Sequence, residues 1–431
     1  MNIIGTYNNT KSILSQTIEW INVLSAMYLA VTLILPFDYQ HPALYAYFTS
    51  VGLDIIINKR HANVKWDKTK WTFAAMILFY LCIWIWHPFE ETNLPYFQTT
   101  TEKRIGLLIM GILGLFTNIN PKLKPQLLAI PIMSTGIILI LYILYQIDFK
   151  FSTFDSFQTY QLTIANYRSQ IMHISHMNFN LYMNCGLIFG FYGITQNNKL
   201  KEKVIYSFFM LLSALIIITS EGRIGIFTTL IIICILAYYY TYKKNKYLLI
   251  PFIVLSILTT HLIFTNNYRA EDFQKNQNPR LYIWNEAIKM IKEKPMFGYG
   301  ISDGRTTLVN KLFENNDLNN EFLIPWFIDF PDYNKYSLHA HNIFLESLIE
   351  FGIIGLILIT CILFLPIILT RGKKQLLLSL FILIFTLQGL TESYGSHLSI
   401  FILSWFLYII TLSPTSEPNS ESANKQITNN I

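Results

Sequence analysis

The chain has 431 residues, of which 52% are hydrophobic, 15% aromatic and only 13% charged. Soluble globular proteins carry about 25% charged residues, so this composition excludes an ordinary soluble protein. The four cysteines fall in four different apolar runs with no paired spacing, which excludes a disulfide framework. The longest apolar runs have the length of membrane-spanning helices: residues 127–145, 204–219, 224–240 and 353–369.

Twelve apolar runs follow one another between polar breaks. A helix needs about 20 residues to cross the hydrocarbon core of a bilayer, so each run predicts one transmembrane helix. No cleavable signal peptide precedes the first run, and the first helix is expected to act as an uncleaved insertion signal. The predicted spans are residues 18–36, 42–58, 71–88, 104–119, 126–147, 178–195, 204–220, 224–242, 247–265, 342–370, 376–390 and 395–413.

Lysine and arginine are unevenly distributed among the connections between these spans. With a cytoplasmic N-terminus, 18 of them lie in the cytoplasmic connections and tail, and 5 lie in the short opposite connections. Because cytoplasmic loops retain positive charge, we predict that both termini are cytoplasmic. The net charge of +6 then reflects topology, and no nucleic-acid partner is expected.

These patterns predict an all-α fold: a polytopic membrane protein with about 12 transmembrane helices. Residues 1–265 would hold helices 1–9. Residues 266–341 would form a large periplasmic loop with amphipathic helices between helices 9 and 10. Residues 342–413 would hold helices 10–12, and residues 414–431 would form a disordered cytoplasmic tail.

Residues 280–292 of the long loop predict an amphipathic helix. We expect this helix to lie along the outer boundary between membrane and water. Its apolar residues recur at helical spacing, at Leu281, Trp284, Ala287, Ile288 and Ile291.

The usual motifs of nucleotide and metal chemistry are missing from the sequence. It contains no GxxxxGK[ST], no GxGxxG after a strand and no HExxH. His173 and His176 could approach one another on a helix turn, but no third ligand accompanies them, and Asp-rich clusters suited to Mg²⁺ are lacking. We therefore expect neither a metal site nor a cofactor.

The candidate active site lies where the long loop meets the tenth span. His339 and His341 precede Asn342, which is a good N-cap residue. His341 would therefore lie at the N-terminus of a helix, a position that favours anions. The alternative is a histidine that merely marks the membrane boundary.

Four residues within the tenth span extend this candidate site. Glu346 and Glu350 share one helix face, and intramembrane carboxylates face a polar cavity or bond to neighbouring helices. Gly352 and Gly355 follow one turn later, and small residues let a neighbouring helix approach closely. An ordinary packing motif is the alternative interpretation of the glycines.

Two arginines could supply an anion site beside these residues. Arg223 lies in the short outer connection TSEGRIG, and Arg280 opens the amphipathic segment of the long loop. A guanidinium can bind phosphate oxygens bidentately. The alternative for each is an arginine that snorkels to lipid headgroups.

The sequence resembles the bacterial O-antigen ligases and their relatives, the O-antigen polymerases and protein O-oligosaccharyltransferases. The resemblance rests on His341 and Asn342, followed by nine residues, Gly352, two residues and Gly355. The upstream segment RLYIWNEAIKMIKEKPMFGYG resembles the opening of the family's large periplasmic loop. Its matching residues are Arg280, Trp284, Ala287, Pro295, Gly298 and Gly300.

The resemblance implies a glycosyltransferase of the bacterial inner membrane whose active site faces the periplasm. Its donor would be an undecaprenyl-diphosphate-linked glycan, and its acceptor a sugar hydroxyl of lipid A-core. The reaction would be metal-independent and inverting, with no cofactor, and would occur among membrane lipids.

The family's roles transfer to this sequence by position. His341 would be the catalytic histidine, and Arg280 and Arg223 would bind the diphosphate. In the family the arginine of the short connection more often follows a serine, whereas Gly222 precedes Arg223 here. Candidate supporting residues are His339, Asn342, Glu346 and Glu350.

Three other functions stay open at this point. A polysaccharide polymerase of the same superfamily is the nearest alternative. A protein O-oligosaccharyltransferase is less favoured, because twelve spans and one loop leave no room for a large extra domain. A secondary transporter would fit the number of helices, but the sequence shows no convincing internal repeat and no paired interrupted helices.

Overall fold

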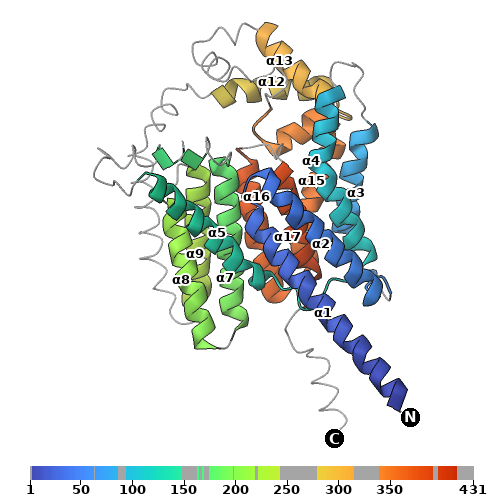
Figure 1. Ribbon diagram of the computed structural model, residues 1–431. Helices are drawn as coiled ribbons and strands as arrows, with labels where there is room; N and C mark the ends of the chain where they lie inside the picture. Colours follow the sequence, from blue (N-terminus) through green and yellow to red (C-terminus); the bar gives the residue numbers. More distant parts are fainter. Residues whose placement is uncertain are drawn as a thin grey trace, which may run out of the picture.

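The computed structural model describes residues 2–62, 64–85, 94–147, 163–164, 167–168, 174–197, 199–218, 222–242, 279–314, 339–391 and 397–414. Over these residues the regular structure is entirely helical, which confirms the all-α prediction. The helices, labelled in Figure 1, are α1 (Asn2–Thr32), α2 (Phe37–Ile57), α3 (Lys70–Ile85), α4 (Leu94–Phe116), α5 (Pro125–Gln146), α7 (His176–Gln196), α8 (Leu200–Ile218), α9 (Arg223–Tyr242), α12 (Pro279–Glu293), α13 (Ile301–Glu314), α15 (Ile343–Leu369), α16 (Gly372–Gly389) and α17 (His397–Leu412).

Eleven of the twelve predicted spans coincide with a described helix, and the span predicted at residues 247–265 lies outside the described residues. α1 and α4 begin well before the apolar runs at 18 and 104, because each residue added to an existing helix gains a backbone hydrogen bond. Among the described helices, α5 and α15 are long and apolar enough to cross a membrane, and α3, α9 and α17 contain shorter apolar stretches. The number of crossings stays a prediction.

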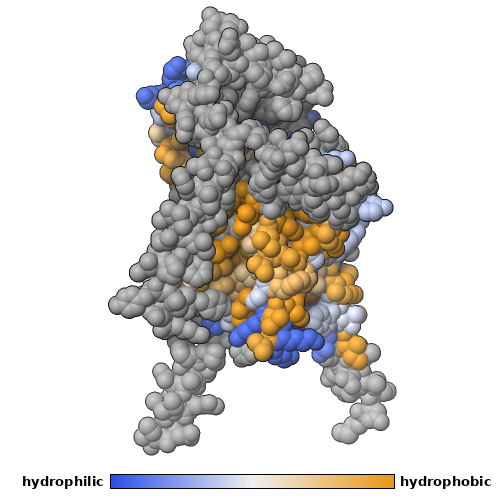
Figure 2. All heavy atoms as spheres, turned by 90° about the vertical axis from the view of Figure 1, so that its left-hand side faces the viewer, coloured by the Kyte–Doolittle hydropathy of each residue, from blue (hydrophilic) through white to orange (hydrophobic). Residues whose placement is uncertain are grey.

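The exterior of the helix bundle is apolar. On α8, side chains three and four residues apart form one outward face, and each of them is more than half exposed: Leu200, Val204, Phe208, Leu211 and Leu215. Figure 2 shows a hydrophobic band on one side of the molecule, with hydrophilic side chains at its lower edge. Soluble monomers rarely expose large contiguous apolar patches, so this is the surface of a membrane protein.

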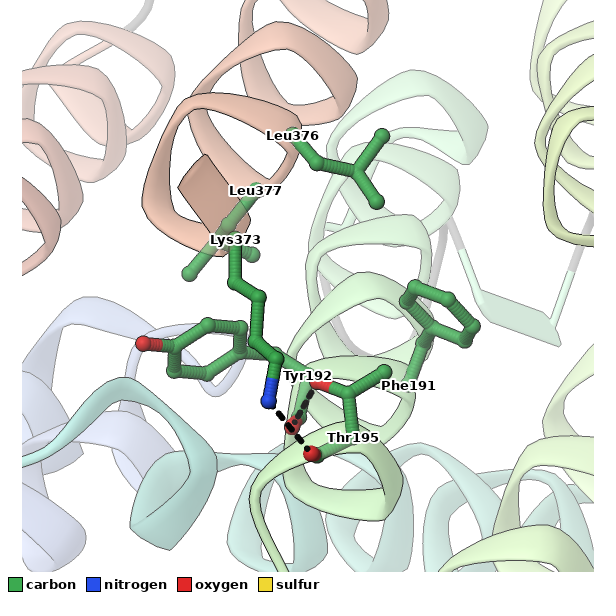
Figure 3. Close-up of a pocket in the computed structure, with 6 residues that line it drawn as sticks. All are labelled: Phe191, Tyr192, Thr195, Lys373, Leu376 and Leu377. Carbon is green, nitrogen blue, oxygen red and sulfur yellow. Dashed lines mark hydrogen bonds between the residues drawn. The ribbon is translucent and has the colours of Figure 1, made fainter. Parts of the chain in front are cut away.

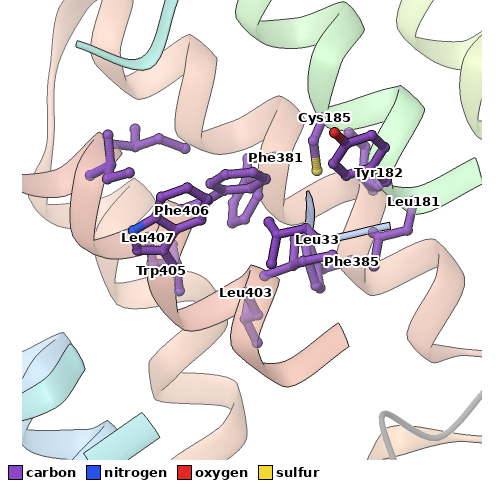
Figure 4. Packing of buried hydrophobic residues seen from close by; sticks show 14 of the residues in the cluster. Leu33, Leu181, Tyr182, Cys185, Phe381, Phe385, Leu403, Trp405, Phe406 and Leu407 are labelled. Carbon is purple, nitrogen blue, oxygen red and sulfur yellow. The ribbon is translucent and has the colours of Figure 1, made fainter. Parts of the chain in front are cut away.

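Aromatic packing joins α7, α16 and α17 in the core. The ring centroids of Phe189 and Phe406 are 4.9 Å apart, and those of Phe381 and Phe406 are 6.1 Å apart. Figure 4 shows these rings of α16 and α17 interleaved with their aliphatic neighbours. Since lipid tails are as apolar as these side chains, close packing holds such helices together in a membrane.

α15 is interrupted at Gly352, and the segment that follows α12 hydrogen-bonds to α15 at this break. At Gly352 the backbone leaves helical geometry, with φ 62° and ψ −150°. Tyr299 N donates to Ile349 O at 2.7 Å, and Gly300 N donates to Glu350 O at 2.9 Å. The segment after α12 therefore supplies hydrogen bonds to the broken part of α15.

Glycine is required on both sides of this junction. Gly298 has φ +67°, and a Cβ there would lie 2.6 Å from Ile349 O. A Cβ on Gly352 would lie 2.4 Å from the carbonyl of Met296, and one on Gly355 would lie 2.6 Å from Ser347 O of the same helix. The prediction that Gly352 admits a neighbouring helix is corrected here, because the structure uses this glycine to break α15 and to admit the loop after α12. Gly355 packs against the preceding turns of its own helix.

Candidate functional site

His341 lies in a tight turn directly before α15. Its φ of +47° is in the left-handed region, which residues other than glycine rarely occupy. Asn342 Oδ1 accepts hydrogen bonds from Phe344 N at 2.9 Å and Leu345 N at 3.1 Å, which confirms the predicted N-cap. Asn342 Nδ2 also donates to Leu390 O at 3.2 Å, so the turn is fixed to the C-terminal end of α16.

His339 and His341 are in direct contact. Their ring centroids are 4.0 Å apart, and His341 N donates to His339 Nδ1 at 3.2 Å. A ring nitrogen that accepts a hydrogen bond carries no proton, so this bond selects neutral His339 with its proton on Nε2. Burial lowers the pKa of His339 well below its ordinary 6.5, and the charges of His341, Arg305, Arg280 and Lys103 act in the same direction.

Because the pKa of His339 is lowered in the folded protein, we expect acid to reduce the stability of the fold. The contribution of His339 to stability is complete above pH 6.5 and is lost as the pH falls toward the folded-state value. Melting temperatures of wild type and His339→Gln, measured from pH 8 to pH 5, should therefore converge as the pH falls. Parallel curves for the two proteins would contradict this role for His339.

Glu346 and Glu350 each form a buried ion pair with a different segment. Arg305 Nε of α13 donates to Glu346 Oε1 at 2.7 Å. Arg104 of α4 binds Glu350 bidentately, with nitrogen–oxygen distances of 2.7 and 2.9 Å. The four side chains are at most 6% exposed. Of the two sequence interpretations, the structure therefore supports carboxylates bonded to neighbouring helices.

We expect the loss of Arg104 alone to destabilise the protein strongly, and the replacement of both Arg104 and Glu350 to destabilise it only slightly. Arg104→Ala leaves Glu350 buried without its cation, which should cost about 3–5 kcal/mol. Replacing both with apolar residues, as Arg104→Met with Glu350→Leu, should restore most of this stability. Thermal melting of the detergent-solubilised variants measures both effects, and equal melting of single and double variants would refute the coupling.

The structure describes the side chain of one of the two predicted anion-binding arginines. Arg280 is the second residue of α12, and its charge acts on His339. Arg223 is the first residue of α9, and its side chain lies outside the described residues. Its backbone is positioned by Asn180, whose Nδ2 donates to Gly222 O at 3.3 Å.

A series of side-chain to backbone hydrogen bonds places the start of α9 at the same end of the bundle as His341. Asn342 bonds to the residue that follows α16. Gln388 Nε2, near the end of α16, donates to Met177 O at the start of α7, at 2.8 Å. Asn180, one turn further along α7, bonds to Gly222 O before α9. Figure 1 shows α12 and α13 at the end opposite to the N-terminus of α1.

The opposite end of α16 carries a small pocket of a different kind. Lys373 Nζ donates to Thr195 O at 3.3 Å, and Figure 3 shows this bond among the apolar side chains that line the pocket. Its lining residues are Phe191, Tyr192, Thr195, Lys373, Leu376 and Leu377. The pocket lacks the paired histidines and buried acids found beside α12, so the latter region is the stronger candidate site.

Arg104 and Arg305 belong to the candidate site through their ion pairs, and the sequence did not indicate them. Arg305 lies among other charged residues of the long loop, and Arg104 lies at the start of the fourth predicted span. The only sequence signal was the presence of two intramembrane carboxylates, which require compensating partners.

Comparison with known proteins confirms the family resemblance. Residues 208–360 match the O-Antigen ligase family, and this range includes Arg223, Arg280, His341, Glu346 and Glu350. A Rickettsia felis protein that is named as a polysaccharide ligase is 34% identical over 85 residues, and a Rickettsia conorii protein named in the same way is 30% identical over 122 residues. The exopolysaccharide production protein ExoQ of Rhizobium meliloti is 33% identical over 84 residues.

These relatives are matched over only part of their length. The aligned segments cover 20%, 26% and 20% of this chain, and 18%, 27% and 17% of the three relatives in the same order. Each alignment therefore covers less than a third of either protein.

Proposed function

We propose that this chain, which contains an O-antigen ligase domain over residues 208–360, is a glycosyltransferase of the inner membrane. It transfers a glycan from undecaprenyl diphosphate to a sugar hydroxyl of lipid A-core at the periplasmic face. The observation that supports the proposal is the placement of His341, in contact with His339 and directly before α15, within the matched domain.

In the proposed reaction, the acceptor hydroxyl oxygen attacks the anomeric carbon of the donor. The bond from that carbon to the diphosphate oxygen breaks, and undecaprenyl diphosphate leaves with the bonding electrons. His341 accepts the proton of the hydroxyl as general base. A single displacement of this kind inverts the anomeric configuration.

The leaving diphosphate requires positive charge at the point where its own charge develops. Arg223 and Arg280 are assigned this role, with the N-terminal end of α15 nearby. As the family resemblance implies, the proposed reaction is metal-independent and uses no cofactor. The polyprenyl tail anchors the donor in the membrane, so donor and acceptor would meet at the lipid boundary.

The proposed diphosphate contacts predict that lysine cannot replace arginine. Arg280→Lys and Arg223→Lys keep the charge but lose the bidentate fork, and a charge-assisted hydrogen bond contributes about 1.5–3 kcal/mol. The KM for the lipid-linked donor should therefore rise roughly tenfold or more. Lys292→Ala, which removes an exposed charge from the same helix as Arg280, is the control and should leave KM unchanged. Unaltered donor use by both lysine variants would argue against phosphate binding.

A polysaccharide polymerase is the second candidate, and similarity to the exopolysaccharide production protein favours it. Deleting the gene and separating lipopolysaccharide on a gel distinguishes the two functions. Loss of a ligase leaves bare core, with long glycan retained on the lipid carrier. Loss of a polymerase leaves core that bears a single repeat, and this result would refute our first choice.

A further inference from the structure

Ala340, between the two histidines, has both of its backbone polar atoms bound by side chains. Its carbonyl accepts a hydrogen bond from Trp284 Nε1 at 2.8 Å. Its amide donates to Glu346 Oε2 at 2.8 Å. The residue is completely buried, so these two side chains replace water as its hydrogen-bond partners.

The two bonds fix both peptide planes of the 339–341 turn. The amide of Ala340 belongs to the peptide that joins it to His339, and its carbonyl belongs to the peptide that joins it to His341. Because a peptide unit is planar, holding one of its polar atoms restricts the rotation of the whole unit. The positions of the two histidine Cα atoms are thereby set by Trp284 and Glu346.

Glu346 is itself held in one orientation. Its second oxygen accepts from Arg305 Nε at 2.7 Å, and its side chain is 5% exposed. Trp284 packs against the buried cluster formed by α12, α13 and α15. Three separate elements therefore converge on a turn whose next residue, His341, has a left-handed backbone. Such conformations persist where the surrounding structure over-determines them.

We infer that Trp284 and Glu346 are positioning residues, which direct the His341 imidazole toward the acceptor hydroxyl by fixing the 339–341 turn. This inference rests on the proposed function, because it assigns a purpose to the placement of the proposed base. Neither residue touches the reacting atoms. Their contribution should therefore appear in the rate of the chemical step and not in donor binding.

The test uses the full chain in proteoliposomes with a purified lipid-linked donor and lipid A-core acceptor. Trp284→Phe keeps an aromatic ring but loses the N–H donor. Glu346→Gln keeps the length, but its single amide oxygen cannot replace both carboxylate oxygens. Misplacement of a catalytic group by about 1 Å can cost roughly 10²-fold, so kcat should fall about ten- to hundredfold while KM for the donor stays within about twofold.

Ile283→Val is the matched control, because it loosens the same buried cluster without removing a hydrogen bond to the turn. Rates are compared per mole of folded, monodisperse protein. Ile283→Val should lower thermal stability and keep the wild-type kcat. If Trp284→Phe does not fold, Glu346→Gln decides the question alone.

Two results would overturn the inference. In the first, His341→Ala is inactive while both positioning variants keep the wild-type kcat, and the proposed function then survives without the inference. In the second, the variants reduce the amount of folded protein, as Ile283→Val does, but not the rate per mole of folded protein. Their role would then be purely structural. Full transfer by His341→Ala would instead refute the proposed catalytic base, and the inference with it.

Discussion

Replacing His341 with alanine is expected to lower the kcat of glycan transfer by about 10²- to 10⁴-fold, the usual contribution of a general base. The variant keeps Asn342 as N-cap and both buried ion pairs, since none of these bonds uses the His341 side chain. It should therefore fold and bind the lipid-linked donor. Transfer measured with purified protein in proteoliposomes, together with donor binding, separates loss of chemistry from loss of structure.

His61→Ala is the matched control for this experiment. His61 is exposed in the connection after α2, so its loss should change neither transfer nor stability. A His341→Ala protein that transfers glycan at the wild-type rate would exclude His341 as the base and would reopen the transporter interpretation.

Gly352→Ala is expected to destabilise the protein by more than about 3 kcal/mol. A non-glycine residue at φ 62°, ψ −150° costs about 1–3 kcal/mol in backbone energy. The added Cβ would also lie 2.4 Å from the Met296 carbonyl, so the loop after α12 would have to move away from α15. Thermal melting measures the loss of stability, and reduced transfer by the remaining folded protein would report displacement of the loop.

Gly52→Ala supplies the comparison. Gly52 lies within α2, and a Cβ there would meet nothing within 4 Å. Alanine is favoured over glycine in a helix by about 0.5–1 kcal/mol, so this variant should melt at or above the wild-type temperature. If Gly352→Ala melted like Gly52→Ala, the break in α15 would not depend on glycine.

Local signals predicted the helices well, because hydrophobic length and period are properties of the sequence itself. The amphipathic segment at 280–292 is α12, as predicted, and part of its apolar stripe, including Ala287, is buried in the protein. Ile283 and Met290 are buried, whereas Leu281 and Ile288 are 40% and 43% exposed. Which apolar stripe is buried depends on how α12 packs against α13 and α15, and this arrangement cannot be read from helical period alone.

The candidate site was predictable where the signal was local and unpredictable where it depended on tertiary structure. The N-cap at Asn342 follows from residue type and position. The pairing of Arg104 with Glu350 joins residues 246 positions apart, so it depends on the packing of α4 near α15. The glycine spacing after Glu350 favours helix packing, because no local signal indicates that a loop enters a broken helix there.

The most direct test of the proposed function is reconstitution of the purified chain in proteoliposomes with undecaprenyl-diphosphate-linked glycan and lipid A-core. We expect glycan joined to lipid A-core, with release of undecaprenyl diphosphate, and loss of both products in His341→Ala. Longer glycan on the lipid carrier with lipid A-core unmodified would contradict it and would identify a polymerase.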